Sequence, residues 1–154
     1  MGDATLTRVL RTHAFTQGFS ESQIETLADL ASRVVFAENE VILIPGERST
    51  SFYLLIAGSV AVELRTALYS VCVQALGPGH VFGWSALLDR QDTLFQVRAR
   101  ERTSALRLDG GALAAACRAE PQLGAEIYCR TLQVVAGRVK ATEQRFAEMC
   151  GVKL

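Results

Sequence analysis

The sequence predicts a mainly β fold with flanking helices: an antiparallel roll of about eight strands, preceded by short helices and followed by one long helix. Such a roll is also called a jelly roll or double-stranded β-helix. Three observations support this prediction. The 154-residue chain is 49% apolar, which is enough for one domain with its own core. Short β-branched and aromatic runs alternate with turn residues over 33–108. Apolar residues recur at helical spacing before and after that region.

The first segment, residues 1–32, is expected to form an N-terminal helical unit. Leu6, Val9 and Leu10 have the spacing of one face of a short helix over 4–12. Ser20 and Gln23 form a capping box, which predicts a second helix over 21–32.

The second segment, residues 33–108, is expected to form the roll. Strands are predicted over 34–36, 41–44, 52–56, 60–65, 71–76, 95–99 and 104–108, with a short extended piece after residue 79. Val60, Val62 and Leu64 alternate with smaller or polar residues, which is typical of a half-buried strand. Glu63, between them, is expected to be a solvated charge.

A glycine-rich corner interrupts the roll, and residues 76–94 around it are here called the cassette. Its glycines and proline supply the backbone freedom and the fixed φ that tight turns need: Gly77, Pro78, Gly79 and Gly83. The run Trp84–Leu88 is predicted to wind into one helical turn with unpaired first amides, a candidate anion site. The alternative is a corner that binds nothing.

Two helices are expected after the roll, over 109–119 and 121–150. Asp109 is a candidate N-cap, and Pro121 separates the helices because proline suits only a first turn. The long helix carries an a/d heptad seam: Tyr128, Leu132, Val135, Val139, Thr142, Phe146 and Met149. A second apolar line contains Ile127, Val134 and Ala141. One stripe is expected to pack on the roll and the other on a partner helix, which predicts a homodimer; the alternative is one intramolecular groove that buries both.

Charge and composition exclude several classes of partner. Sixteen basic and sixteen acidic residues give no net charge, so no nucleic acid is expected. The sequence has neither a bilayer-spanning apolar run nor a secretory signal, which predicts a cytoplasmic protein without a membrane partner. The four cysteines match no metal-site spacing and are each expected to be buried, reduced thiols: Cys72, Cys117, Cys129 and Cys150.

Two motifs carry a resemblance to a known family. Pro45-Gly46-Glu47 is followed, over 52–62, by Phe-Tyr-Leu-Leu-Ile-Ala-Gly-Ser-Val-Ala-Val, and Phe82-Gly83 opens the second half of the cassette. In this order and spacing the motifs resemble the cyclic nucleotide-binding domain and its phosphate-binding cassette. The resemblance covers about residues 10–150 and implies one ligand-sensing regulatory domain over 1–154, without a DNA-binding helix-turn-helix.

The two polar anchors that this resemblance implies are absent from their positions. Family members that bind cyclic nucleotide have an acidic residue for the ribose after the Phe-Gly pair, where this chain has Trp84. An arginine about nine residues later pairs with the phosphate, where this chain has Thr93, followed by Leu94. Arg90 and Arg98 lie nearby, but neither stands at that position.

The resemblance therefore implies a regulatory module that senses a small anionic ligand and binds cyclic AMP or cyclic GMP weakly or not at all. The expected pocket residues are Phe82, Gly83, Trp84, Ser85, Ala86, Leu87, Thr93 and Leu94. A ligand-free dimerisation or scaffold module and a metal-independent cupin-like protein stay open as alternatives. No catalytic arrangement is evident, so an enzyme is not expected, and a regulatory protein partner is a further expectation.

Overall fold

The computed structural model describes residues 3–88 and 92–154. Three helical elements come first, namely α1 (Ala4–Thr12), the 3-10 turn η1 (Ala14–Thr16) and α2 (Glu21–Leu30). The strands are β1 (Ala31–Phe36), β2 (Val41–Leu43), β3 (Ser51–Ala57), β4 (Val60–Arg65), β5 (Ser70–Leu76), β6 (Val81–Phe82), β7 (Gln96–Ala99) and β8 (Thr103–Asp109). The 3-10 turn η2 (Trp84–Leu87) lies between β6 and β7, and α3 (Gly110–Ala119) and α4 (Pro121–Met149) follow β8. The predicted fold class is confirmed.

The roll consists of two four-stranded antiparallel sheets, in the orders β1-β8-β3-β6 and β2-β7-β4-β5. Apolar side chains fill the space between them: Tyr53, Leu55, Val60, Val62, Leu76, Phe82, Val97 and Ala105. Tyr53 stacks on Phe82 with ring centroids 4.7 Å apart. This contact holds the short strand β6 against β3 and so positions the start of η2.

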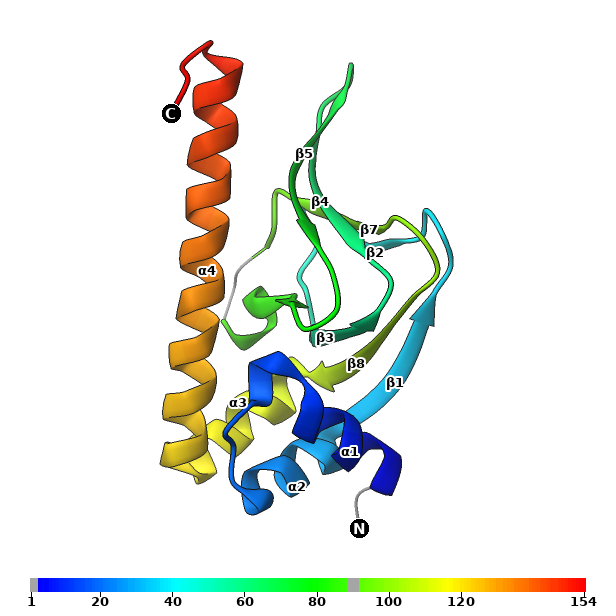
Figure 1. The fold of residues 1–154 in the computed structure, drawn as a ribbon, viewed down its shortest axis with the longest axis vertical. Helices are drawn as coiled ribbons and strands as arrows, with labels where there is room; N and C mark the ends of the chain where they lie inside the picture. The colour runs from blue at the N-terminus through cyan, green and yellow to red at the C-terminus, as the bar shows by residue number, and fades with distance from the viewer. Residues whose placement is uncertain (1–2, 89–91) are drawn as a thin grey trace.

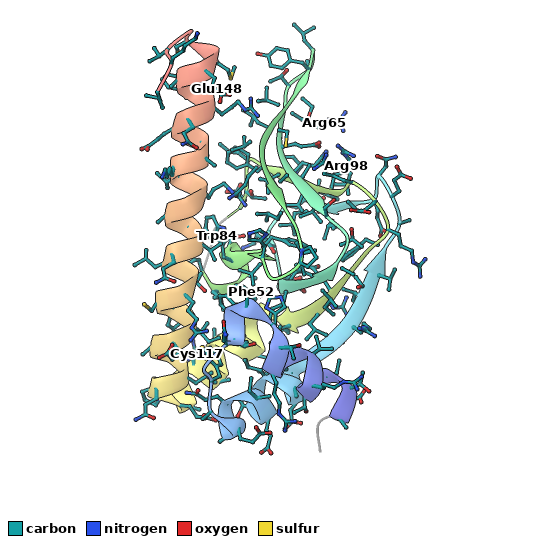
Figure 2. The ribbon with its side chains drawn as sticks, viewed as in Figure 1. Phe52, Arg65, Trp84, Arg98, Cys117 and Glu148 are labelled. Atoms are coloured by element: carbon teal, nitrogen blue, oxygen red, sulfur yellow. The ribbon has the colours of Figure 1, made fainter. Side chains whose placement is uncertain are left out.

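A second core joins the first sheet to the helices. Because successive strand residues face opposite sides, Phe52 and Leu54 of β3 point to the helices while Leu55 points into the roll. Phe15 of η1 packs on Phe52 with ring centroids 5.4 Å apart. Figure 2 labels Phe52, which lies near α1 and the lower end of the roll. Burial on both faces explains why the sequence of β3 is almost continuously apolar.

The long helix α4 runs beside the roll, while α1, α2 and α3 gather at one end of it (Figure 1). Leu123 and Ile127, in the first turns of α4, are buried in the second core. Further along, α4 presents one face to the roll and the other to solvent. The helix therefore faces the cassette across the roll side and contributes residues to a cavity described below.

Several boundaries differ from the predicted ones. The helix predicted over 21–32 ends at Leu30, and Ala31 already pairs with Leu108 of β8. Sheet pairing overrides the helical pattern there. The strand predicted over 41–44 ends at Leu43, the helix predicted over 109–119 starts at Gly110, and Cys150 caps α4.

Two predictions about single side chains are wrong. Glu63 is only 6% exposed, because Arg98 and Gln96 of the neighbouring strand β7 bind its carboxylate. Of the four cysteines, Cys117 alone is buried; Cys72 on β5 and the two on or after α4, Cys129 and Cys150, are exposed. Period-two and heptad patterns do not specify which face of an edge strand or a protruding helix is covered.

Candidate functional site

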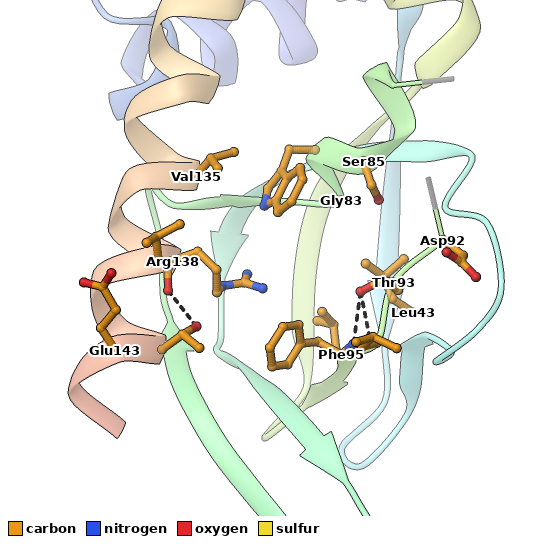
Figure 3. A pocket seen from close by; sticks show the side chains of 14 residues that line it. Leu43, Gly83, Ser85, Asp92, Thr93, Phe95, Val135, Arg138 and Glu143 are labelled. Atoms are coloured by element: carbon orange, nitrogen blue, oxygen red, sulfur yellow. Dashed lines mark hydrogen bonds between the residues drawn. The ribbon is translucent and has the colours of Figure 1, made fainter. Parts of the chain in front are cut away.

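The site starts at Gly83, where the chain leaves β6. Its φ of +79° lies in the left-handed region, and a Cβ there would sit 2.4 Å from the carbonyl oxygen of Ser51. Only glycine satisfies both conditions. The turn directs Ser85 towards the segment before β7 that contains Thr93 (Figure 3), and Trp84 lines the same cavity.

The amides of η2 are less available than the sequence suggests. The N–H of Ala86 donates to the carbonyl of Gly83 at 3.0 Å, and that of Leu88 to Ser85 at 3.0 Å. The start of α3 presses on the same turn, since a Cβ on Gly110 would lie 2.4 Å from the Ala86 carbonyl oxygen. Ala86 is therefore held against α3.

The second wall is the segment before β7. The hydroxyl of Thr93 accepts from the N–H of Phe95 at 3.1 Å and donates to its carbonyl at 3.3 Å. The carbonyl of Thr93 accepts from the N–H of Gly46 at 2.7 Å, which ties this segment to the Pro45-Gly46 turn. The Thr93 hydroxyl is thus engaged with its own backbone.

The third wall is α4. Arg138 extends from it on the side of Phe95 (Figure 3), and its Nε donates to Oε1 of Gln74 on β5 at 2.9 Å. Its guanidinium carbon lies 5.7 Å from the Phe95 ring centroid. Burial lowers the pKa of Arg138 to about 10. One turn later, the Thr142 hydroxyl donates to the Arg138 carbonyl at 2.8 Å.

These three walls enclose a cavity of about 360 Å³, a size that suits a small molecule. Its lining is mostly apolar, with one basic residue among those the structure describes. The lining residues are Leu43, Gly83, Trp84, Ser85, Asp92, Thr93, Leu94, Phe95, Val97, Val135, Arg138, Val139, Thr142 and Glu143.

The structure brings together five of the eight predicted pocket residues: Gly83, Trp84, Ser85, Thr93 and Leu94. The other three face elsewhere. Phe82 is fully buried inside the roll, Ala86 packs on α3, and Leu87 packs against the second core. Along the 3-10 turn, Trp84 and Ser85 line the cavity while Ala86 and Leu87 pack on α3 and the second core, so adjacency in sequence did not imply a shared pocket.

The heptad seam is divided between two environments. Val135 and Thr142 line the cavity, and Val139 lies at its edge. The remaining seam residues are exposed, as is Val139: Tyr128, Leu132, Phe146 and Met149. Arg138 was not predicted as a pocket residue, because its heptad position lies off the seam; a basic residue beside an apolar stripe was the available signal.

Arg98 is not among the residues that line the cavity. Arg98 on β7 donates to Glu63 Oε1 at 2.5 Å and to Asn39 Oδ1 at 2.9 Å. Its hydrogen bond lowers the pKa of Glu63. Arg90 lies outside the described residues.

Over residues 3–88 and 92–154, the His, Cys, Asp and Glu side chains form no group of three or more that is able to hold a metal ion. In that same part of the chain, every helix is too short or too polar to cross a bilayer.

Comparisons with known proteins agree with this geometry. The sequence model of the cyclic nucleotide-binding domain family matches residues 33–120, which is more than half of the chain. A candidate potassium channel protein of Rhodopseudomonas palustris is 36% identical over 99 residues. That match covers 64% of this chain and 23% of the channel protein, so the chain spans less than a quarter of that relative.

Solved structures show the same fold. A cyclic nucleotide-binding domain from Methylobacillus flagellatus aligns with a TM-score of 0.77 and 18% identity, covering 94% of this chain and 82% of that one. A candidate cyclic nucleotide-binding protein from Geobacter metallireducens aligns with a TM-score of 0.74 and 21% identity, covering 86% and 97%. At these identities the likeness concerns the fold alone.

Proposed function

The chain belongs to the cyclic nucleotide-binding domain family, and from that premise we propose that it is a regulatory module that senses a small ligand in the cavity between the cassette and α4. The observation that carries the proposal is that three separate elements, α4 among them, form the walls of the cavity. A ligand there contacts η2, the segment before β7 and α4 at once. Its binding energy therefore depends on where α4 lies, which is the requirement for a ligand to shift a conformational equilibrium.

We propose further that cyclic AMP and cyclic GMP are weak ligands of this cavity, or not ligands. Trp84 occupies the position of the family's ribose acceptor, and the Thr93 hydroxyl is bound to Phe95. A hydrogen bond to a charged group contributes about 1.5–3 kcal/mol, so losing the phosphate anchor alone weakens binding about 10- to 150-fold. Loss of the ribose acceptor weakens it further.

Titration calorimetry with cyclic AMP and cyclic GMP tests this part of the proposal. For the natural chain, the Kd of each nucleotide is expected to exceed about 100 μM. A Trp84→Glu, Thr93→Arg double variant, which restores both anchors, is expected to bind at least 10-fold more tightly. Circular dichroism of the double variant checks that it is folded. Sub-micromolar binding to the natural chain would contradict the proposal.

The outer face of α4 supports a partner as well as a ligand. Leu132 and Phe146 are 68% and 69% exposed, and Tyr128, Val139 and Met149 extend the same apolar seam. We propose that this seam packs on a second copy of the chain, with a regulatory protein as the alternative partner. Sedimentation equilibrium is expected to give a dimer that Leu132→Glu dissociates. A monomeric natural chain at micromolar concentration would contradict the homodimer.

The other two candidate functions have less support. An open cavity beside Ser85 disfavours a scaffold module with a closed pocket. The cavity residues include no paired nucleophile and base, so we propose a regulatory rather than an enzymatic role. The cytoplasmic location remains a prediction from the sequence.

A further inference from the structure

Arg138 is a cation with spare donors inside a mostly apolar cavity. A guanidinium has five N–H donors, and only the Nε donor has a hydrogen-bond partner among the described residues, the amide oxygen of Gln74. Figure 3 shows the guanidinium reaching from α4 into the cavity, on the side of Phe95, and Trp84 lines the same cavity. The two terminal nitrogens of the guanidinium are therefore available to a ligand in the cavity.

The charge of Arg138 is poorly compensated by the protein. Among the described residues, no carboxylate lies within 4.0 Å of its guanidinium. Burial lowers its pKa to about 10, which is the expected sign for a cation that has lost water without gaining an anion. A bound anion would supply the missing interaction.

Arg130, two turns earlier on α4, shows what a structural arginine looks like in this fold. It pairs with Glu126 at 3.2 Å and donates to the carbonyl of Phe15 at 2.6 Å. Its guanidinium carbon lies 4.5 Å from the Phe19 ring centroid. Arg130 connects the N-terminal unit to α4, whereas Arg138 makes one side-chain hydrogen bond within the described part of the chain and lines the cavity.

The remaining polar groups of the cavity restrict the ligand further. Asp92 and Glu143 are exposed and lie on opposite sides of Arg138 (Figure 3), so they add repulsion for each negative charge on a ligand and favour a ligand with one charge over a ligand with two. The hydroxyls of Thr93 and Thr142 are both engaged with backbone groups. Among the described lining residues, the Ser85 hydroxyl and the Trp84 Nε1–H are the neutral side-chain groups left for the hydroxyls of a sugar, and a buried hydroxyl without a partner is costly.

We infer that the cavity binds a small organic monocarboxylate with an apolar body, whose carboxylate pairs with the Arg138 guanidinium while its body packs on Trp84 and Phe95. The planar carboxylate matches the guanidinium edge with two parallel hydrogen bonds. This inference rests on the proposed ligand-sensing function and assigns the ligand's charge to α4 instead of the cassette. The ligand would then contact α4, the helix that carries the seam, and its binding would favour one position of that helix.

Trp84 is the only tryptophan in the sequence and lines the cavity, so its fluorescence reports occupancy. The probes are 3-phenylpropionate, 4-phenylbutyrate and octanoate, each compared with its neutral amide, together with adenosine and cyclic AMP. At least one carboxylate is expected to bind with a sub-millimolar Kd, its amide at least 10-fold more weakly. Arg138→Gln is expected to weaken the carboxylate at least 10-fold, and Arg138→Lys less than Arg138→Gln.

The outcomes separate the inference from the function on which it rests. Binding of adenosine or the amides, with the carboxylates no tighter and Arg138→Gln without effect, would overturn the inference and leave ligand sensing intact. Failure of every probe, adenosine and cyclic AMP included, would overturn both.

A ligand-free measurement provides a second test. If Arg138 serves a ligand, Arg138→Met is expected to lower the Tm of the unliganded protein by less than the control below, because removal of a desolvated charge offsets the loss of the hydrogen bond to Gln74. The matched control Arg130→Met is expected to lower Tm, since it leaves the Phe15 carbonyl without its donor. Equal losses of Tm in the two variants would make Arg138 a structural residue and overturn the inference.

Discussion

Replacing Gly83 with alanine tests how the site is built, because two separate costs meet at this residue. The left-handed backbone, with φ of +79°, costs an L-residue about 1–2 kcal/mol. The added Cβ would also lie 2.4 Å from the Ser51 carbonyl oxygen, a backbone atom of β3 that cannot move aside cheaply. Overpacking of this kind costs about 1–3 kcal/mol, so Gly83→Ala is expected to lower the free energy of unfolding by about 2–5 kcal/mol.

Gly46→Ala is the matched control. Gly46 has nearly the same φ, +80°, but a Cβ there would meet nothing within 4 Å. This variant is expected to cost only the backbone share, about 1–2 kcal/mol. Urea denaturation followed by circular dichroism measures both values, and Tm is expected to fall about 2–4 °C per kcal/mol in a chain of this size. Equal losses in the two variants, or a neutral Gly83→Ala, would refute the idea that the contact with β3 positions η2.

Two further predictions concern pH. His13 is buried, accepts from the N–H of Phe15 through Nδ1 and contacts the carbonyl of Leu55 through Nε2. Because burial lowers the pKa of His13, the free energy of unfolding should fall as the pH drops below about 6.5. Urea titrations at several pH values should show that slope in the natural chain and not in His13→Gln. The pKa of Glu63 is lowered chiefly by its hydrogen bond with Arg98, so its contribution to the free energy of unfolding should be present above about pH 4.5 and lost in more acidic solution. Glu63→Gln should lower the free energy of unfolding by about 1–3 kcal/mol at pH 7 and make it less dependent on pH in acid. An unchanged dependence in acid would contradict the role of the Glu63–Arg98 pair.

Local sequence patterns predicted the elements because each pattern expresses one local constraint. The capping box at Ser20 and Gln23 forms as predicted, with 3.2 Å between the Gln23 nitrogen and the Ser20 hydroxyl. Pro121 opens α4 because a first-turn residue needs no N–H partner. The end of α2 was not predictable in the same way, since the pairing of Ala31 with β8 depends on a strand more than seventy residues away.

The candidate site was predictable only in part, for a similar reason. The cassette motif identified the segment with Trp84 and Thr93, because both lie within one short stretch whose turns are encoded locally. The polar interactions of Glu63 and the orientation of Arg138 depend on neighbours from other strands and on the rotation of α4 against the roll. A heptad pattern specifies which helix residues share a face, but not what that face contacts.

The sequence by itself determined the order of the elements, the family motifs and the presence of Trp84 and Thr93 at the positions where nucleotide anchors are expected. Those features are decided by side-chain periodicity, by the φ requirements of glycine and proline, and by residue identity at fixed spacing. Only the tertiary structure decided that Leu43, Trp84, Phe95 and Arg138 share one cavity, because packing of α4 against the roll brings together segments that are separated by up to about a hundred residues. Burial on that scale is set by the complementarity of whole surfaces, which no local pattern encodes.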